Sequence, residues 1–371
     1  MKMQGTMKCA IYYGPKDVKM EQRPIPQITE NDVLVKILRA GICGSDLTAW
    51  NYGGEPTGVF PGNPFGHEMV GKIVEKGAKV GKDINVGDIV FVEPLKSTKA
   101  GTIMADMLGG FGEYVKVENA KSHHNIYVLP QNVDLDSAAL IEPFSVGAKG
   151  AICMNASKDE NVVVLGAGPI GLSAAATLVA RGLKNVVVVD RVDWRLDIAK
   201  DLGAKTINTA TEDLQSKLLE IFGEAPQHAI DFSAVDPKLL QQIFAYTQKV
   251  GMNFSAKTPN VDLVVDAAGA MPLLAQFIAN SKHGTKFSIV AVYKNNVEIP
   301  GASFVMNEPC FKGSQGYDRE TIEEVIGYIV NKKVDAKKMV TAKYKHANFV
   351  EAITAAANPD KNVKVLIEYA E

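Results

Sequence analysis

The sequence has few cysteines and tryptophans and no long apolar run. Its 371 residues include 4 Cys and 2 Trp. The cysteines are scattered, which predicts no disulfide framework and favours a reducing compartment, and the apolar surroundings of Cys9 and Cys310 predict that both are buried. No apolar stretch approaches the roughly 20 residues of a membrane-spanning helix, and the first residues lack the apolar core of a secretory signal. We therefore expect a cytoplasmic protein without a membrane partner.

An excess of charge of either sign is also lacking. The chain has 40 basic and 42 acidic residues, for a formal net charge of −2. Because no basic patch or run of like charges stands out, we expect no nucleic-acid partner. A length of 371 residues with 46% hydrophobic residues predicts a globular chain of two domains, with a small molecule as its ligand.

Two sequence patterns divide the chain. Residues 1–155 are rich in short β-like runs punctuated by glycine and proline, which predicts a β-rich domain. Residues 156–312 alternate apolar strands with helices, the pattern of a parallel sheet covered on both faces. Residues 313–371 contain an amphipathic helix and a last strand, and we expect them to fold back on the first domain. The predicted fold class is α/β, with a β-rich domain joined to a doubly wound parallel sheet.

One connection in the second domain is unusually long. Residues 224–258 exceed what a helix-to-strand connection needs. Within them, residues 237–250 predict an amphipathic helix with an apolar side. We interpret it as an extra surface helix; the alternative is a contact with another subunit.

A glycine-rich motif follows the first apolar strand of the second domain. Residues 162–171 read VVVLGAGPIG, and an alanine-rich helical stretch comes next. In a dinucleotide-binding turn, Gly166 would allow the bend, Gly168 would admit the pyrophosphate and Gly171 would let the helix pack closely. The phosphates would lie at the helix N-terminus, where Pro169 belongs to the same predicted site.

An acidic residue ends the next apolar run. The sequence NVVVVD closes on Asp190, whose carboxylate would bind the adenosine ribose and repel a 2′-phosphate. Arg191 and Arg195 are of the kind that accommodates such a phosphate, but we expect Asp190 to dominate. The predicted cofactor is NAD.

The first domain contains a set of metal-binding residue types. Cys43 lies in GICGSD, His67 and Glu68 lie in GHE, and Glu142 precedes a proline. Thiolate, imidazole and carboxylate together suit zinc, and a catalytic zinc needs about three protein ligands and one open position. Each residue alone has a plainer explanation, as a core cysteine, a hydrogen-bonded histidine or the start of a helix.

Together with GDIVFVEP, IEP and the glycine motif, these residues resemble the zinc-containing medium-chain alcohol and polyol dehydrogenases. The motifs cover nearly the whole chain in order and spacing. The resemblance implies a GroES-like catalytic domain and a Rossmann domain, with one catalytic zinc per subunit held by Cys43 and His67. Glu68 and Glu142 remain alternatives for the third ligand.

The resemblance also implies roles for individual residues. Zinc would act as a Lewis acid on the substrate oxygen, so that a hydride can pass to the nicotinamide. Ser45 matches the start of a proton relay, and Asp46 matches a carboxylate that orients the zinc-bound histidine. With His67 and Glu68 they form the expected catalytic set. Further cofactor contacts are implied for Ile170, Arg195, Ala268 and Val290.

Two departures from the family pattern affect this prediction. Residues 95–114 contain no cysteine where many relatives have four, so we predict no structural zinc. The sorbitol dehydrogenase branch also lacks those cysteines, and the chain resembles it at CGSDLTAW and IEPFSVG. That branch's aromatic residue before the tryptophan is replaced by Ala49, however, and its Arg-Tyr pair by Gly316-Tyr317. A polyol substrate is therefore not fixed.

Aromatic residues are expected to line the substrate pocket, which would suit a modest secondary alcohol or ketone. The candidates are Trp50, Phe60, Phe111, Phe144 and Tyr317. Each has a plainer role as core. In the resembled family, the last strands of the nucleotide domain pair across a twofold axis, which implies a homodimer or a homotetramer.

The predicted activity is NAD-linked, zinc-dependent oxidation of a secondary alcohol, diol or polyol, with ketone reduction in reverse. Threonine and sugar phosphates are alternative substrates, although only Lys149 offers a basic group for a substrate phosphate. Two further alternatives are a zinc-free, quinone-reductase-like enzyme and a non-catalytic nicotinamide-binding protein. A zinc-free pocket gives no reason to retain Cys43 together with His67.

Overall fold

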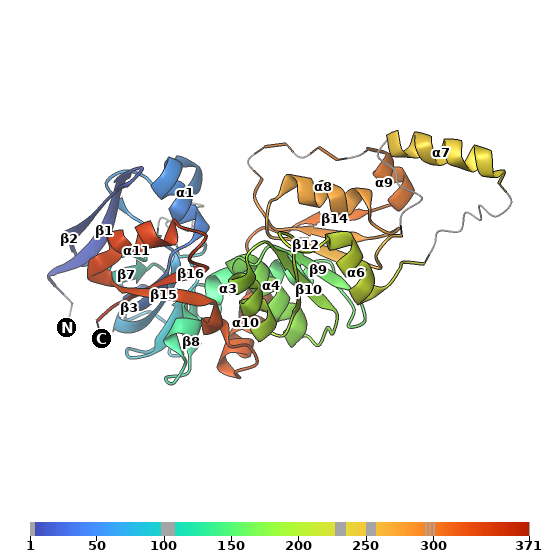
Figure 1. Cartoon of the computed structure of the whole chain (residues 1–371). Helices are drawn as coiled ribbons and strands as arrows, with labels where there is room; N and C mark the ends of the chain where they lie inside the picture. The colour runs from blue at the N-terminus through green and yellow to red at the C-terminus, as the bar shows by residue number, and fades with distance from the viewer. Residues whose placement is uncertain are drawn as a thin grey trace. The chain divides into compact units, whose positions relative to one another are not determined.

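The computed structural model describes residues 4–97, 108–226, 235–249, 257–293, 295–296, 298–299 and 301–370. The chain forms two compact units, the first made of Met1–Ser145 with Asp318–Glu371 and the second of Val146–Tyr317 (Figure 1). The sequence placed the domain boundaries after residues 155 and 312. Helix α3 (Ile141–Ile152) runs from one unit into the other.

The first unit is built on two β-sheets. One has the order β2-β1-β4, and the other has the order β15-β16-β3-β5-β6-β8 with β7 paired to β3. The strands are β1 (Thr6–Gly14), β2 (Asp17–Pro24), β3 (Val33–Gly41), β4 (Asn63–Pro64), β5 (Glu68–Lys76), β6 (Ile89–Val92), β7 (Tyr114–Val117), β8 (Ile126–Leu129), β15 (Val340–Lys345) and β16 (Lys364–Glu368). The helices are α1 (Gly44–Tyr52), α2 (Leu135–Ala138), α10 (Arg319–Val330) and α11 (Phe349–Ala356), with short 3-10 turns at Glu55–Thr57, Ala336–Met339 and His346–Asn348.

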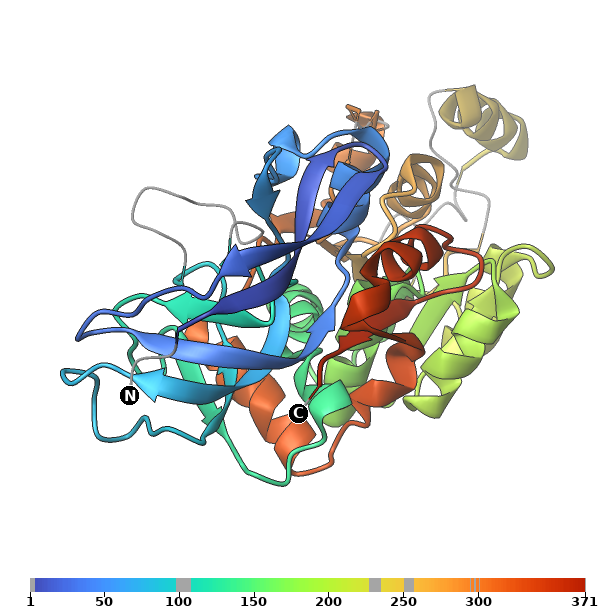
Figure 2. The ribbon, with the colours of Figure 1, turned by 90° about the vertical axis from the view of Figure 1, so that its left-hand side faces the viewer.

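The end of the chain returns to the first unit, as predicted. Strand β16 pairs antiparallel with β3, with Leu366 opposite Gly41, and Figure 2 shows the two side by side. Between the sheets and α11, Phe111 packs against Phe65 and Phe349, with ring centroids 4.9 and 4.5 Å apart. All three rings are fully buried, so the last helix completes the core of the first unit.

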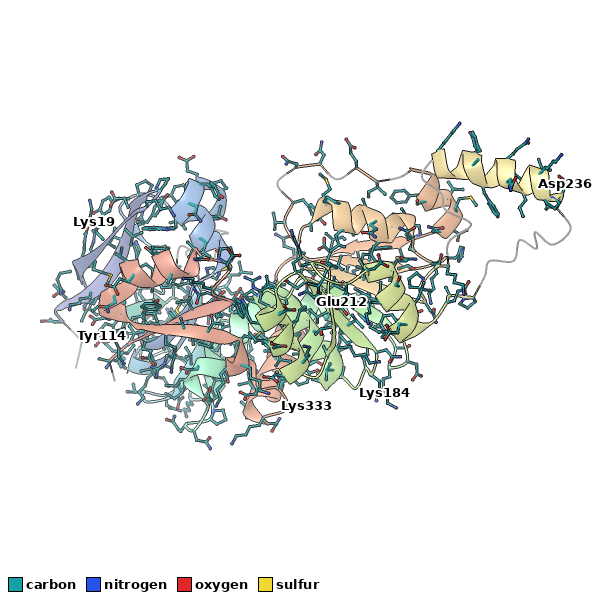
Figure 3. The ribbon with its side chains drawn as sticks, in the orientation of Figure 1. Lys19, Tyr114, Lys184, Glu212, Asp236 and Lys333 are labelled. Carbon is teal, nitrogen blue, oxygen red and sulfur yellow. The ribbon has the colours of Figure 1, made fainter. Side chains whose placement is uncertain are left out.

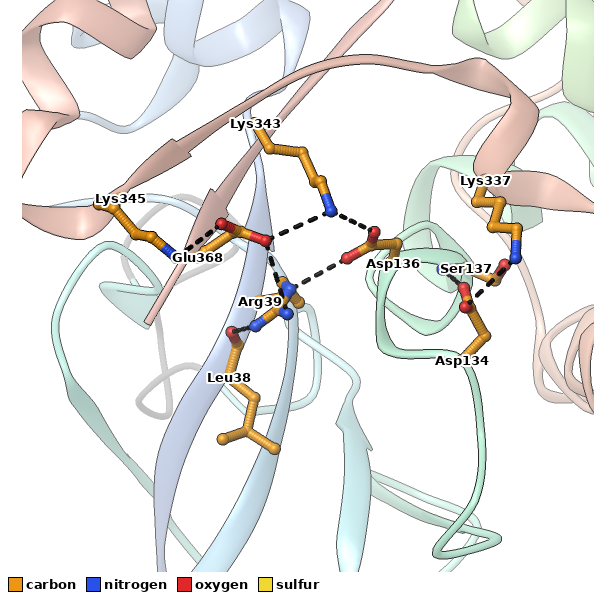
Figure 4. A network of polar contacts seen from close by, with 9 residues as sticks. All are labelled: Leu38, Arg39, Asp134, Asp136, Ser137, Lys337, Lys343, Lys345 and Glu368. Atoms are coloured by element: carbon orange, nitrogen blue, oxygen red, sulfur yellow. Dashed lines mark hydrogen bonds and ion pairs between the residues drawn. The ribbon is translucent and has the colours of Figure 1, made fainter. Parts of the chain in front are cut away.

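A network of ion pairs links strands β3, β15 and β16 with helix α2 (Figure 4). Arg39 on β3 contacts Asp136 on α2 at 3.0 Å and Glu368 on β16 at 3.6 Å. Lys343 on β15 bridges the same two carboxylates at 3.0 and 3.3 Å. Because Arg39, Asp136 and Glu368 are only 17–20% exposed, water screens these pairs less than it screens surface ion pairs.

The second unit contains a six-stranded parallel sheet of order β11-β10-β9-β12-β13-β14. This order is that of a doubly wound dinucleotide-binding fold, as predicted. Its strands are β9 (Val162–Leu165), β10 (Val186–Asp190), β11 (Lys205–Asn208), β12 (Leu263–Asp266), β13 (Lys286–Ile289) and β14 (Cys310–Gly313). Its helices are α4 (Pro169–Ala180), α5 (Asp193–Asp201), α6 (Leu214–Phe222), α7 (Pro237–Lys249), α8 (Met271–Ala279) and α9 (Gly301–Asn307). The central strands are unbroken apolar runs because helices cover both faces.

Of the two cysteines that were expected to be buried, only one is buried in the structure. Cys9 lies on β1 and is fully buried, as expected. Cys310 is exposed, so that expectation is wrong. The reason is topological: Cys310 begins β14, the last strand of the sheet, which within the described residues pairs on one side only.

The long connection contains the predicted helix, α7. Asp236 precedes it and caps its N-terminus, since its Oδ1 accepts the backbone N–H groups of Lys238 and Leu239 at 2.9 and 3.1 Å (Figure 3). Leu239 and Tyr246 on this helix are 51% and 65% exposed. A role for α7 in subunit contacts remains a prediction, and residues 227–234 and 250–256 of the connection lie outside the described residues. Among the described helices, none has the length and apolarity needed to cross a bilayer.

The charge network generates a stability prediction. Replacing Arg39 with Met should lower the free energy of unfolding by about 1–2 kcal/mol, because the largely buried Asp136 carboxylate loses a hydrogen-bonded cation and Glu368 loses a cation at 3.6 Å. Urea unfolding followed by tryptophan fluorescence would measure the change. The control is Lys19→Met, which removes a 3.7 Å pair between side chains that are 59% and 50% exposed and should leave the urea midpoint nearly unchanged. Equal effects of the two substitutions would contradict the structural role given to the network.

Candidate active site

The pairing of β3 with β5 brings two distant motifs together. Gly41, the last residue of β3, lies opposite Glu68, the first residue of β5. Cys43 follows β3 by two residues and His67 immediately precedes β5, so both side chains lie at the same end of the strand pair. The ligand atoms of Cys43, His67 and Glu68 all lie within 4.8 Å of one another. Antiparallel register thus explains why GICGSD and GHE belong to one site.

Two glycines leave room for this cluster. A Cβ atom on Gly41 would come within 2.1 Å of Glu68 Oε2, so the close approach of that carboxylate requires glycine. Gly66 has φ of +94°, and a Cβ there would lie 2.6 Å from the ring of Phe111. The glycine before His67 therefore permits a left-handed turn against a packed aromatic core.

The first turn of α1 fixes the backbone of the cysteine. Cys43 is the N-cap residue of this helix, and its N–H donates to Oδ2 of Asp46 at 2.8 Å. The Asp46 side chain is fully buried, and Ser45 is half-buried in the same turn. The hydrogen bond from Cys43 to Asp46 thus holds the backbone of the cysteine in position. The proton relay of Ser45 and the orientation of His67 by Asp46 remain predictions.

A buried lysine at this site was missed in the sequence. Lys364, the first residue of β16, is 3% exposed at its side chain, and its Nζ lies 2.7 Å from both carboxylate oxygens of Glu68. The same ammonium donates to the carbonyl oxygen of Ile42 at 3.1 Å. The sequence feature that could have identified this lysine is its position at the start of KVLIEY, an otherwise apolar run that predicts a strand. A charge in such a strand needs a partner.

Burial and neighbouring charges shift the pKa values of Cys43 and Lys364. Burial raises the pKa of the Cys43 thiol, while the charges of His67 and Lys364 act in the opposite direction. Burial alone would lower the pKa of Lys364, but Glu68 and Cys43 outweigh it and the pKa is raised, so the ammonium stays charged. A bound zinc would add a strong positive charge and deprotonate the thiol.

The fourth candidate ligand lies beside this cluster. Glu142 is in the first turn of α3 and is 7% exposed. It is not among the residues whose ligand atoms lie within 4.8 Å of one another, although its charge also raises the pKa of Lys364. One thiol, one imidazole and a nearby carboxylate are the donors that zinc prefers, so the residues present fit this metal.

The residues predicted to line an aromatic pocket belong to both units. Trp50, Phe111 and Phe144 are 4%, 0% and 0% exposed, as expected of core residues. Phe60 is 42% exposed, and Tyr317 is half-buried and belongs to the second unit. The assignment of these residues to a substrate pocket remains a prediction.

The glycine motif of the second unit has the local geometry of a dinucleotide-binding turn. Gly166 has φ of +94°, and a Cβ on Gly171 would come within 1.8 Å of the Gly166 carbonyl oxygen. A Cβ on Gly168 would meet nothing within 4 Å, so the approach to the N-terminus of α4 is open there. Pro169 begins this helix, where a proline fits without losing a hydrogen bond.

The carboxylate of Asp190 lies beside this turn at the end of β10. Its Oδ2 accepts the N–H of Ala167 at 2.7 Å, and its Oδ1 accepts those of Arg191 and Val192 at 2.7 and 3.0 Å. Asp190 is therefore held in position by the backbone.

The other predicted cofactor residues occupy several elements of the same unit. Ala268 lies 3.2 Å from the Cβ position of Gly166, and Val290 follows β13. Ile170 is in the first turn of α4 and Arg195 is in α5. Contacts of these residues with a cofactor remain predictions.

Comparison with known proteins places both units in one family. Residues 29–129 match the sequence profile of the alcohol dehydrogenase GroES-like domain, and residues 169–256 match that of zinc-binding dehydrogenases. Sorbitol dehydrogenase of Bacillus subtilis (strain 168) is 30% identical over 91% of this chain and 90% of its own length. L-galactonate-5-dehydrogenase of Escherichia coli (strain K12) is 28% identical over 94% of both chains. The crystal structure of 2R,3R-butanediol dehydrogenase from Bacillus subtilis superposes with a TM-score of 0.78 at 24% identity, covering 98% of this chain and 99% of that one.

The glycine geometry predicts opposite outcomes for two similar substitutions. Gly168→Ala should fold with unchanged thermal stability, since its methyl group meets open space at a φ of −80°, but should weaken dinucleotide binding about tenfold or more by blocking the pyrophosphate. Gly171→Ala should cost about 1–3 kcal/mol of unfolding free energy, because its methyl group overlaps a backbone oxygen. Thermal unfolding and calorimetric titration with NADH would measure both. A Kd for NADH that is the same in Gly168→Ala as in the unmodified protein would refute the predicted position of the pyrophosphate.

Proposed function

This chain belongs to the zinc-containing medium-chain alcohol and polyol dehydrogenases, and we propose that it transfers a hydride between NAD and a secondary alcohol, diol or polyol. Ketone reduction is the reverse reaction. The observation that carries the proposal is the convergence of Cys43, His67 and Glu68, with ligand atoms within 4.8 Å of one another. Relatives named for sorbitol and L-galactonate support a hydroxyl-rich substrate class.

In this proposal Cys43 and His67 hold the catalytic zinc, and Glu68 or Glu142 supplies the third protein ligand. Bound zinc supplies Lewis-acid chemistry to the substrate oxygen. Bound NAD would supply the acceptor for the hydride of the carbinol carbon, and Ser45 would accept the hydroxyl proton and pass it toward solvent. Asp46 keeps the Cys43 backbone in place throughout, through the hydrogen bond that caps α1.

We propose NAD rather than NADP as the cofactor. Three backbone N–H groups hold the Asp190 carboxylate at the end of β10, next to the glycine turn. In this position the carboxylate can accept hydrogen bonds from a ribose diol, and its charge would repel a 2′-phosphate.

We also propose that the protein is a homo-oligomer and that it is located in the cytoplasm. A homodimer or homotetramer would extend the parallel sheet past β14, whose Cys310 and Lys312 are exposed. Scattered free cysteines favour a reducing cytoplasm. The absence of structural zinc remains a prediction too, since residues 98–107 lie outside the described residues.

Removing the thiolate should separate chemistry from cofactor binding. We expect Cys43→Ser to lower kcat by about 100-fold or more and to lose zinc, because a hydroxyl is a poor zinc ligand, while the Kd for NADH stays within about threefold. Cys310→Ser, at an exposed cysteine of the other unit, should retain both zinc and turnover. Zinc analysis and steady-state kinetics would measure these changes. Full turnover by metal-free Cys43→Ser would overturn the proposed function.

Removing the Asp190 carboxylate should change the cofactor preference. We expect Asp190→Ala to reduce the ratio of kcat/KM for NAD to that for NADP by about tenfold or more, because it removes both the ribose acceptor and the repulsion. Asp193→Ala, a nearby acid at the start of α5, is the matched control. An unchanged ratio in the Asp190 variant would exclude Asp190 as the determinant.

A further inference from the structure

We propose that Tyr293 is a positioning residue for the nicotinamide half of the cofactor, and that it acts through the carboxylate of Asp266. Its hydroxyl fastens the loop that follows β13 to the end of β12, at the edge of the sheet where the cofactor would lie. The inference rests on the proposed function, because it concerns the cofactor of that reaction. Neither residue was among the candidates that the sequence suggested.

Asp266 is the residue at which the loops after two strands meet. It ends β12 and is fully buried. Its Oδ1 accepts the N–H groups of Ala268 and Gly269 at 3.0 and 3.1 Å, which fixes the loop after β12. Its main-chain carbonyl oxygen accepts the N–H groups of Val290 and Ala291, both at 3.0 Å, from the loop after β13. One residue therefore organises both loops.

Tyr293 adds a side-chain contact between these loops. Its hydroxyl donates a hydrogen bond to Oδ2 of Asp266, and its half-buried ring packs against the apolar core of the second unit. Burial and the neighbouring carboxylate raise the pKa of Tyr293, so the hydroxyl keeps its proton and acts as the donor at neutral pH. Because a buried carboxylate oxygen that loses its donor is destabilising, this contact favours one position of the loop.

Close packing connects the two loops with the rest of the cofactor site. A Cβ on Gly166 would lie 3.2 Å from Ala268, so the loop after β12 lies against the glycine turn. A Cβ on Gly150 would lie 2.2 Å from Cγ2 of Val290, so the loop after β13 lies directly against the backbone of α3. Tyr293 therefore acts on a backbone that adjoins the predicted pyrophosphate site.

The order of the strands puts the nicotinamide over these loops in the proposed complex. A dinucleotide crosses the carboxyl edge of such a sheet where the strand order reverses, which is here between β9 and β12. With the adenosine ribose bound at Asp190 on β10, the nicotinamide half extends over the carboxyl ends of β12 and β13. These are the ends that Asp266 and Tyr293 join. A small displacement there would misplace the reacting carbon of the ring.

Loss of the Tyr293 hydroxyl should therefore affect the nicotinamide and spare the rest of the cofactor. Tyr293→Phe keeps the ring, and we expect its Kd for NADH to rise about tenfold while its Kd for ADP-ribose, which lacks the nicotinamide, stays within about twofold. Hydride transfer in a single turnover should slow about tenfold or more, because the reacting atoms are no longer aligned. Calorimetric titration and stopped-flow absorbance would measure these changes.

Two further variants separate positioning from the loss of a buried hydrogen bond. Tyr328→Phe removes a tyrosine–glutamate hydrogen bond of α10, in the first unit, and is the matched control that should change the Kd of neither ligand. Asp266→Asn should itself weaken NADH binding selectively. If Tyr293 acts through Asp266, Asp266→Asn/Tyr293→Phe should bind NADH within about twofold of Asp266→Asn alone.

Equal Kd values for NADH in Tyr293→Phe and in the unmodified protein would overturn the inference, and so would equal weakening of NADH and ADP-ribose. Should Tyr293→Phe fail to fold, Asp266→Asn decides: selective loss of NADH binding supports the inference, and unchanged NADH binding overturns it. Failure of the proposed function gives a different result, in which the unmodified protein binds NADH but oxidises no alcohol. An unmodified protein that binds no NADH would overturn both.

Discussion

The antiparallel pairing of β3 with β5 is the constraint on which the proposed site depends. With Gly41 opposite Glu68, the pairing brings a cysteine that follows one strand close to a histidine that precedes the other. A one-residue slip would send alternate side chains to the opposite face and separate them. The return of β16 beside β3 adds Lys364 to the same strand ends. Three distant parts of the sequence thus meet because their strands are neighbours in one sheet.

Both units use glycines where the backbone must turn sharply or where another group approaches closely. In the first unit, Gly41 and Gly66 leave space for a carboxylate and a turn, and in the second, Gly166 and Gly171 allow a helix to begin against a tight turn. A Cβ atom would lie 2.1 Å from a carboxylate oxygen at Gly41, 2.6 Å from a ring atom at Gly66 and 1.8 Å from a backbone oxygen at Gly171, while Gly166 has a φ of +94°. Gly168 is different, because the space beside it is open within the described residues. Packing therefore does not explain the glycine at this position, and the proposed explanation is a bound dinucleotide.

Much of this architecture was predictable from local sequence. The apolar runs VVVL, VVVVD and LVVD are strands because both faces of a parallel sheet are buried, and the amphipathic pattern of residues 237–250 does form a helix. The first unit's convergence of Cys43 with His67 was predictable only through the resemblance to a family. Lys364 was missed because its role depends on strand order, which one sequence does not specify. Exposure of Cys310 was missed for the same reason, since an edge strand and a central strand share one apolar pattern.

The central claim is that a zinc ion held by Cys43 and His67 is required for alcohol oxidation with NAD. The most direct measurement is the rate of NAD reduction across secondary alcohols, diols, polyols and threonine, before and after chelation and again after zinc is added back. The account predicts activity toward at least one hydroxyl substrate that chelation removes and zinc restores. Activity that persists at full rate in verified metal-free protein would contradict it.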